Sequence, residues 1–214
     1  MNSFRGPFSL LDQLLASADE ALRALSGSVA PARPSPASDH SMPVAEDDRR
    51  VSAGLMRVNH TGEICAQALY SGQSLVARNA RVRAALHGAA AEERDHLAWC
   101  RTRLDELGSR PSLLDPVWYV GSFAWGVASG LAGDRWSLGF LAETEAQVER
   151  HLEGHLERLP ADDGASRAIV AKMRDDEARH GQTGRSLGAA ELPYVVKRAM
   201  QSASKVMTRT AYWV

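Results

Sequence analysis

The sequence has little cysteine and almost no net charge. Only two of its 214 residues are cysteine, too few for the disulfide framework of a small secreted domain. Both thiols are expected to be reduced, as in a cytosolic protein, and the N-terminus shows no export signal. Lysine and arginine number 25 against 26 aspartate and glutamate, so the net charge is −1. This balance gives no reason to expect a nucleic-acid partner.

The chain also lacks the alternating pattern of β-strands and a Gly-x-Gly-x-x-Gly motif for dinucleotides. Its composition, 44% hydrophobic and 24% charged, excludes collagen-like and disordered proteins and fits one domain with its own core. Alanine, leucine, arginine and glutamate, which are good helix formers, dominate the later part of the chain. We therefore expect an all-α protein with helices over residues 47–77, 80–107, 135–159, 165–187 and 193–210.

The first 46 residues differ from the rest. Leucines at helical spacing from residue 8 to about residue 25 predict a short amphipathic helix. Four prolines then fall among serines and alanines, so residues 27–46 are expected to form a flexible linker. Residues 47–214 are expected to form the main domain, and the sequence assigns no role to residues 1–46.

Two short segments repeat a pattern of acidic-Glu-x-x-His inside predicted helices, and they end at His96 and His180. A glutamate and a histidine three residues apart lie on one face of a helix and can bind the same metal site. A single glutamate precedes each motif by about the length of one helical hairpin. Glu63 lies 30 residues before Glu93, and Glu145 lies 32 residues before Glu177. Two such hairpins bring four glutamates and two histidines to one level of a four-helix bundle. This is the ligand set of ferritin-like di-metal carboxylate proteins.

Four carboxylates in the core of a bundle require a compensating cation, and this ligand chemistry favours iron or manganese. Glu92 and Asp176 each lie four residues before a motif histidine and are candidates to orient an imidazole across the bundle. His60, three residues before Glu63, is a weaker candidate. His151 reaches the site only if a π-bulge distorts its helix. The alternative is a solvated helix face whose Glu and His pairs bind no metal. The other histidines are expected at the surface: His40, His87 and His155.

Four stretches around these residues resemble the motifs of the bacterial demethoxyubiquinone hydroxylase family of ubiquinone biosynthesis. The stretches are residues 56–73, 93–96, 142–151 and 175–181, and the resemblance covers about residues 47–214. It implies a ferritin-like di-iron bundle in which Glu93 and Glu177 bridge the irons. Tyr70, in the first stretch, is a further candidate for a residue that contacts a metal ligand without binding the metal itself. The implied iron ligands are Glu63, Glu93, His96, Glu145, Glu177 and His180.

The resemblance implies O₂-dependent hydroxylation of the ring of a polyprenyl-methyl-methoxy-benzoquinol, with two iron ions per chain. One oxygen atom enters the ring and the other leaves as water, so two electrons are required. The family is thought to obtain them from NADH or from the quinol itself. Other proteins of quinone biosynthesis are implied partners. Two alternatives stay open: a ferritin-like iron store or iron-dependent peroxidase without an organic substrate, and a helical membrane adaptor that needs no metal.

Residues 116–133 carry no charge, and their 18 positions are at the lower limit for spanning a bilayer. Four glycines and the flanking Asp115 and Asp134 disfavour a span. We expect a crossover helix between the two hairpins that lies in the membrane interface, with a buried core helix as the alternative. The C-terminal amphipathic helix over residues 193–210 fits an anionic lipid surface or a partner helix. We therefore expect a peripheral protein at the cytoplasmic face of the cell membrane, with its oligomeric state open.

Overall fold

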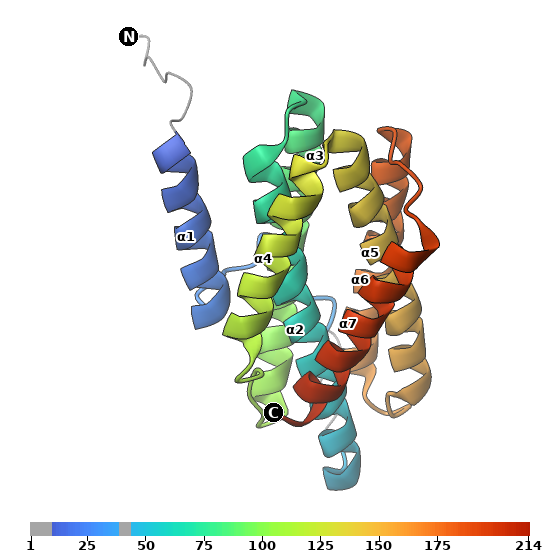
Figure 1. Cartoon of the computed structure of the whole chain (residues 1–214). Coiled ribbons are helices and arrows are strands. Elements are labelled where there is room, and N and C mark those ends of the chain that lie inside the picture. The colour runs from blue at the N-terminus through green and yellow to red at the C-terminus, as the bar shows by residue number, and fades with distance from the viewer. Residues whose placement is uncertain (1–9, 39–43) are drawn as a thin grey trace.

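The computed structural model describes residues 10–38 and 44–214, and these residues form seven helices and no strand (Figure 1). The all-α prediction is confirmed. Each helix predicted in the main domain begins and ends within three residues of an observed one, including the crossover expected in the uncharged stretch 116–133. The helices are α1 (Leu10–Ser26), α2 (Glu46–Val76), α3 (Ala80–Glu106), α4 (Asp115–Leu131), α5 (Asp134–Arg158), α6 (Gly164–Ser186) and α7 (Tyr194–Trp213).

Four long helices form the bundle. Two antiparallel hairpins, α2 with α3 and α5 with α6, pack together through contacts of α3 with α6 and of α2 with α5. Short loops join the helices of each hairpin, and a side chain caps the second helix of each. Asn79 accepts a hydrogen bond from the Arg81 amide at 2.8 Å, and Asp163 accepts one from the Ser166 amide at 2.9 Å. These caps fix where the chain reverses, and thus the register of the hairpins.

Two apolar clusters fill the bundle, one on each side of a polar level. One cluster includes Met56, Trp99 and Met173. The other includes Tyr70 and Leu86. Between these residues along the helices lie the glutamates and histidines of the predicted metal site. The apolar layers exclude water from this level, which makes uncompensated charge there costly.

The crossover helix α4 covers α2 at close range. Gly72 of α2 faces Gly126 of α4, and a Cβ at either position would collide with a backbone carbonyl of the opposite helix. Only one side of α4 is buried, while Val117, Val120 and Trp125 on its other side are exposed. The predicted crossover helix between the two hairpins is confirmed, and its exposed side shows that α4 is not a buried core helix. Its place in a membrane interface stays a prediction. Among the described residues, no helix has the length and apolarity to cross a bilayer.

The helices outside the bundle lie on its surface. α7 crosses α2 and α5, and Figure 1 shows it on the same side of the bundle as α4. Most of α7 is partly or fully exposed, and Val195, Val206 and Trp213 are among its exposed apolar side chains. α1 packs against α2 and α4. The predicted start of α1 at residue 8 lies outside the described residues.

Candidate metal centre

The four helices of the bundle each direct acidic or imidazole side chains toward one buried level. α2 contributes Glu63 and α5 contributes Glu145, while α3 and α6 each contribute a glutamate and a histidine. All six side chains are at most 7% exposed. The structure therefore brings together the whole set that spacing and resemblance indicated: Glu63, Glu93, His96, Glu145, Glu177 and His180.

These residues form two groups that could each hold a metal ion. The first contains Glu63 and His96 and the second contains Glu145 and His180, while Glu93 and Glu177 belong to both. Within each group the ligand atoms lie within 4.8 Å of one another. The groups are thus adjacent and share two carboxylates.

The shared glutamates present a different oxygen to each group. Glu93 directs Oε2 to His96 Nδ1 at 3.1 Å and Oε1 to His180 Nδ1 at 3.2 Å. Glu177 directs Oε1 to His96 Nδ1 at 3.3 Å and Oε2 to His180 Nδ1 at 3.4 Å. A carboxylate placed in this way can bridge two cations.

The charges of the cluster indicate a deficit of positive charge. Burial, with the neighbouring charge of Glu93, raises the pKa of Glu63 well above its usual value. Burial and Glu177 do the same to the pKa of Glu145. Burial alone would lower the pKa of His180, but Glu177 and Glu93 raise it to about 10. Protons thus compensate carboxylates that a divalent cation would compensate more fully.

Several buried atoms of the cluster make no hydrogen bond of good geometry, although some lie within ion-pair distance of one another. They include Glu63 Oε2, Glu93 Oε1, Glu177 Oε2 and His180 Nδ1. Buried polar atoms without partners are unfavourable, and here they face one another within reach of a common ion. Oxygen donors with two imidazoles fit iron or manganese and disfavour metals that prefer thiolates. The residues present therefore fit a pair of metal ions.

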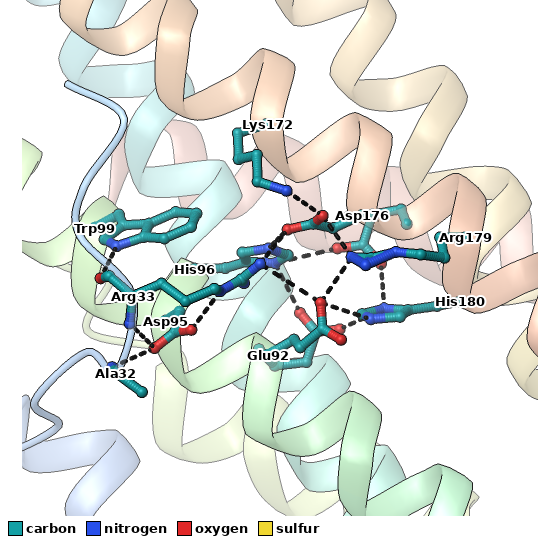
Figure 2. Close-up of polar contacts among 12 residues, drawn as sticks. Ala32, Arg33, Glu92, Asp95, His96, Trp99, Lys172, Asp176, Arg179 and His180 are labelled. Carbon is teal, nitrogen blue, oxygen red and sulfur yellow. Dashed lines mark hydrogen bonds and ion pairs between the residues drawn. The ribbon is translucent and has the colours of Figure 1, made fainter.

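The outer nitrogen of each histidine faces a carboxylate of the opposite motif (Figure 2). Asp176 Oδ2 lies 3.1 Å from His96 Nε2, and Glu92 Oε2 lies 3.5 Å from His180 Nε2. These carboxylates leave the Nδ1 atoms facing the shared glutamates. The buried Tyr70 hydroxyl donates a hydrogen bond to Glu145 Oε1. Asp176 and Tyr70 thus form hydrogen bonds with members of the cluster, while Glu92 lies at ion-pair distance from His180.

Two other candidate residues do not belong to either group. His60 directs Nδ1 to Asp115 Oδ2 of α4 at 3.2 Å. His151 would reach the cluster only through a π-bulge, but α5 is a regular α-helix in this region. The His151 ring instead lies against that of His155, with the ring centroids 3.9 Å apart.

The predictions for the remaining histidines had mixed outcomes. The predicted surface position of His155 is wrong, since this residue is 2% exposed and its Nδ1 lies 2.7 Å from Asn59 Oδ1. That amide supplies the polar partner that makes burial of the imidazole tolerable. His87 is exposed as predicted, and His40 lies outside the described residues.

The sequence did not indicate Arg33, which reaches the edge of the site from the predicted linker. Its guanidinium donates to Asp95 Oδ2 at 2.6 Å and to Asp176 Oδ2 at 2.8 Å. No local pattern could reveal these contacts, because 62 and 143 residues separate the partners in sequence.

A cavity of about 240 Å³ opens beside the cluster between α3, α5 and α6. His180, Glu92 and Arg179 form its polar end. The rest of its wall is mainly small and apolar: Ala85, Gly88, Ala89, Leu138, Leu141, Thr183 and Gly184. The cavity therefore combines an apolar wall with contact to a candidate ligand.

The bundle and its buried carboxylate and imidazole groups are those of the ferritin-like di-metal carboxylate class. Within that class, residues 50–211 match the family described as ubiquinone biosynthesis protein COQ7, and the chain belongs to this family.

Several relatives are similar over nearly their whole length. A protein of Cupriavidus necator is 58% identical over 94% of this chain and 99% of its own length. Proteins of Ralstonia pickettii and Bordetella petrii are 54% and 56% identical, over 95% and 98% of this chain and 99% and 93% of their own lengths. All three are named 3-demethoxyubiquinol 3-hydroxylase.

Proposed function

We propose that this chain is a 3-demethoxyubiquinol 3-hydroxylase, which adds a ring hydroxyl to a polyprenylated methoxy-benzoquinol with O₂ as co-substrate. The observation that carries the proposal is the pair of buried groups that share Glu93 and Glu177. Two adjacent ions suit the two-electron chemistry of O₂, which a single structural ion would not explain. The names of the relatives supply the substrate class.

In this proposal the six residues of the cluster would hold two iron ions, and Glu93 and Glu177 belong to both groups of candidate ligands. When bound, iron would supply redox chemistry toward O₂, with the electrons coming from an external reductant. Asp176 and Glu92 keep the histidine Nδ1 atoms directed at the centre, and Tyr70 fixes one oxygen of Glu145. The apolar clusters above and below keep water from the reacting oxygen.

The cavity beside His180 is the proposed site of the quinol ring. Its volume of about 240 Å³ exceeds the ~150 Å³ that holds a benzene molecule in an apolar protein cavity. Its apolar wall suits the ring and the start of the prenyl tail, and its polar end places the ring next to the cluster.

Metal content tests the proposed centre. Purified protein loaded with Fe²⁺ without oxygen should hold about two irons per chain, because the two groups are adjacent and each offers four ligands. Glu177→Ala removes a ligand from both groups and should lower the content to less than one. Asp175→Ala is the matched control, since Asp175 is exposed and its ion pair within residues 10–38 and 44–214 is with Arg174 alone. Less than one iron in the wild-type protein would contradict the proposal.

The reaction is tested in a strain that lacks this gene, whose lipids should accumulate a demethoxy-quinone. The wild-type gene and Asp175→Ala should restore the normal quinone, and Glu177→Ala should not. An iron store or peroxidase of the same fold would leave the quinone profile unchanged in all strains.

We also propose that the protein docks on an anionic membrane through α4 and α7. Val117, Val120 and Trp125 of α4 are exposed, as are Val195 and Val206 of α7, and both helices lie on one side of the bundle (Figure 1). Exposed apolar side chains beside basic ones suit a lipid interface. The basic residues of α7 are Lys197, Arg198, Lys205 and Arg209.

Flotation with vesicles that contain anionic lipid tests this surface. The wild-type protein should float with the vesicles, and Val120→Asp should reduce the floated fraction severalfold, because it places a charge on the apolar side of α4. His87→Asp is the control, since it adds the same charge at an exposed position of α3. Wild-type protein that stays entirely in the aqueous fraction would contradict the membrane proposal.

A further inference from the structure

Residues 28–38, which we call the N-terminal strap, run from α1 along the bundle and lie against α3 near the metal centre. Val29 packs against an apolar cluster that includes Leu97, and Ala37 packs against the cluster that includes Trp99. The Ala32 amide donates to Asp95 Oδ1 at 2.6 Å, and the Trp99 indole donates to the Arg33 carbonyl at 3.3 Å. The strap is thus fixed by backbone and apolar contacts on both sides of Arg33.

The Arg33 side chain joins two helices at the level of His96 (Figure 2). Its Nε donates to Asp95 Oδ2 of α3 at 2.6 Å, and its Nη1 donates to Asp176 Oδ2 of α6 at 2.8 Å. The planar guanidinium, with its donors in a fixed fork, can make both bonds at once. It also lies 5.0 Å above the Trp99 ring, which in turn packs against His96. Arg33 is therefore held in one orientation.

The oxygen of Asp176 that Arg33 contacts is the same oxygen that faces His96 Nε2. The other oxygen, Oδ1, accepts from Lys172 and Arg179, and both of those residues lie on α6 with Asp176 itself. Residues of α6 thus hold Asp176 from its own helix, whereas Arg33 connects it to α3, the helix that carries His96. Arg33 fixes Asp176 Oδ2 relative to the imidazole that it orients.

We propose that Arg33 is a positioning residue of the metal centre, which acts through Asp176 to hold the His96 imidazole in its metal-binding orientation. The N-terminal strap is then a working part of the site and not only a linker. The inference rests on the proposed di-iron function. It adds a residue that is neither a ligand nor in contact with one, since Asp176 lies between Arg33 and His96.

Iron retention tests the proposal. Arg33→Gln should still bind two irons at saturation but release them to a chelator about tenfold faster than the wild-type protein, as expected when an outer partner of a ligand is lost. Arg33→Lys keeps the positive charge but cannot bond Asp95 and Asp176 through a fixed fork. The thermal midpoint of Arg33→Lys should stay near that of the wild type, while iron release from this variant should also be faster.

Arg174→Gln removes a nearby arginine that, in the described part of the chain, pairs with Asp175 alone, and it should leave the rate of iron release unchanged.

A second measurement separates this inference from the proposed function. Hydrogen exchange of residues 28–38 in the metal-free protein should be slow in the wild type and faster in Arg33→Gln. Wild-type protein that binds no iron would refute the function, while the exchange data would still report on the strap. Iron release at the wild-type rate from either Arg33 variant would overturn the positioning role, because a purely structural residue would change the thermal midpoint alone.

Discussion

At the scale of single residues, each histidine of the centre lies between a group of glutamates and a carboxylate from the opposite motif. His96 directs Nδ1 to the glutamates and Nε2 to Asp176. His180 directs Nδ1 to the glutamates and Nε2 to Glu92. The acidic residue one position before each Glu-x-x-His thus lies next to the histidine of the other motif.

Tyr70 donates a hydrogen bond from an uncharged side chain to Glu145. Tyr70→Phe removes the hydroxyl donor and leaves a buried Glu145 oxygen without that bond. We expect the variant to bind two irons but to release them to a chelator about tenfold faster.

Tyr119→Phe is the matched control for this change. Tyr119 is another buried tyrosine, but it lies on α4 outside the cluster. Its variant should release iron at the wild-type rate. Equal rates from both variants would mean that the hydroxyl of Tyr70 does not hold Glu145.

The ligand set was predictable because its residues recur at fixed intervals. Separations of 30 and 32 residues between glutamates match the length of a helical hairpin, so helix geometry alone brings Glu63 level with Glu93 and Glu145 level with Glu177. Arg33 was not predictable, because its contacts depend on where an irregular segment lies in space. The burial of His155 likewise depends on Asn59 from another helix.

At the scale of elements, the position of α4 depends on two glycines that let its backbone approach α2. Gly126→Ala would place a methyl group against the Leu69 carbonyl. We expect a loss of about 1–3 kcal/mol in the free energy of unfolding, because the helices must separate.

Gly121→Ala in the same helix is the control, since a Cβ there meets no atom within 4 Å. It should stabilise the protein by up to about 1 kcal/mol through helix propensity. Chemical denaturation of both variants measures the difference, and equal stabilities would contradict the close packing of α4 on α2.

The bounds of the helices were predictable, because breakers such as Gly108 and Pro160 follow the ends of α3 and α5. For α4 the sequence left two alternatives open, an interfacial helix and a buried one. An uncharged run fits a buried helix as well as one with an apolar outer side. The packing of Gly126 on α2 decides between them, since it turns Val120 and Trp125 outward.

At the scale of the whole molecule, the half-buried His151 and the buried His155 make stability depend on pH. Burial lowers the pKa of His151 to about 4 and that of His155 to about 2, with the Arg158 charge adding to both shifts and His151 adding to that of His155. The unfolded chain protonates both near pH 6.5, whereas the folded chain keeps them neutral. Their contribution is therefore unchanged above about pH 6.5 and becomes destabilising as the pH falls toward 4.

Urea unfolding of the metal-free protein between pH 7 and pH 5 measures this effect. His151 and His155 should each lower the free energy of unfolding by at most about 1.4 kcal/mol per pH unit in that range. His155→Gln should show a shallower decline than the wild type. His87→Gln, at an exposed position, should follow the wild-type curve, and an unchanged slope in His155→Gln would contradict the assignment.

The most direct test of the proposed activity is the origin of the oxygen atom added to the ring. Protein loaded with Fe²⁺ is mixed with a short-chain demethoxyubiquinol and ¹⁸O₂, with NADH or excess quinol as reductant, and the product is analysed by mass spectrometry. We predict a hydroxylated quinol that carries one ¹⁸O atom in wild-type protein, and no product in Glu177→Ala. Wild-type protein that holds two irons and consumes O₂ but leaves the ring unchanged would contradict the proposed hydroxylase.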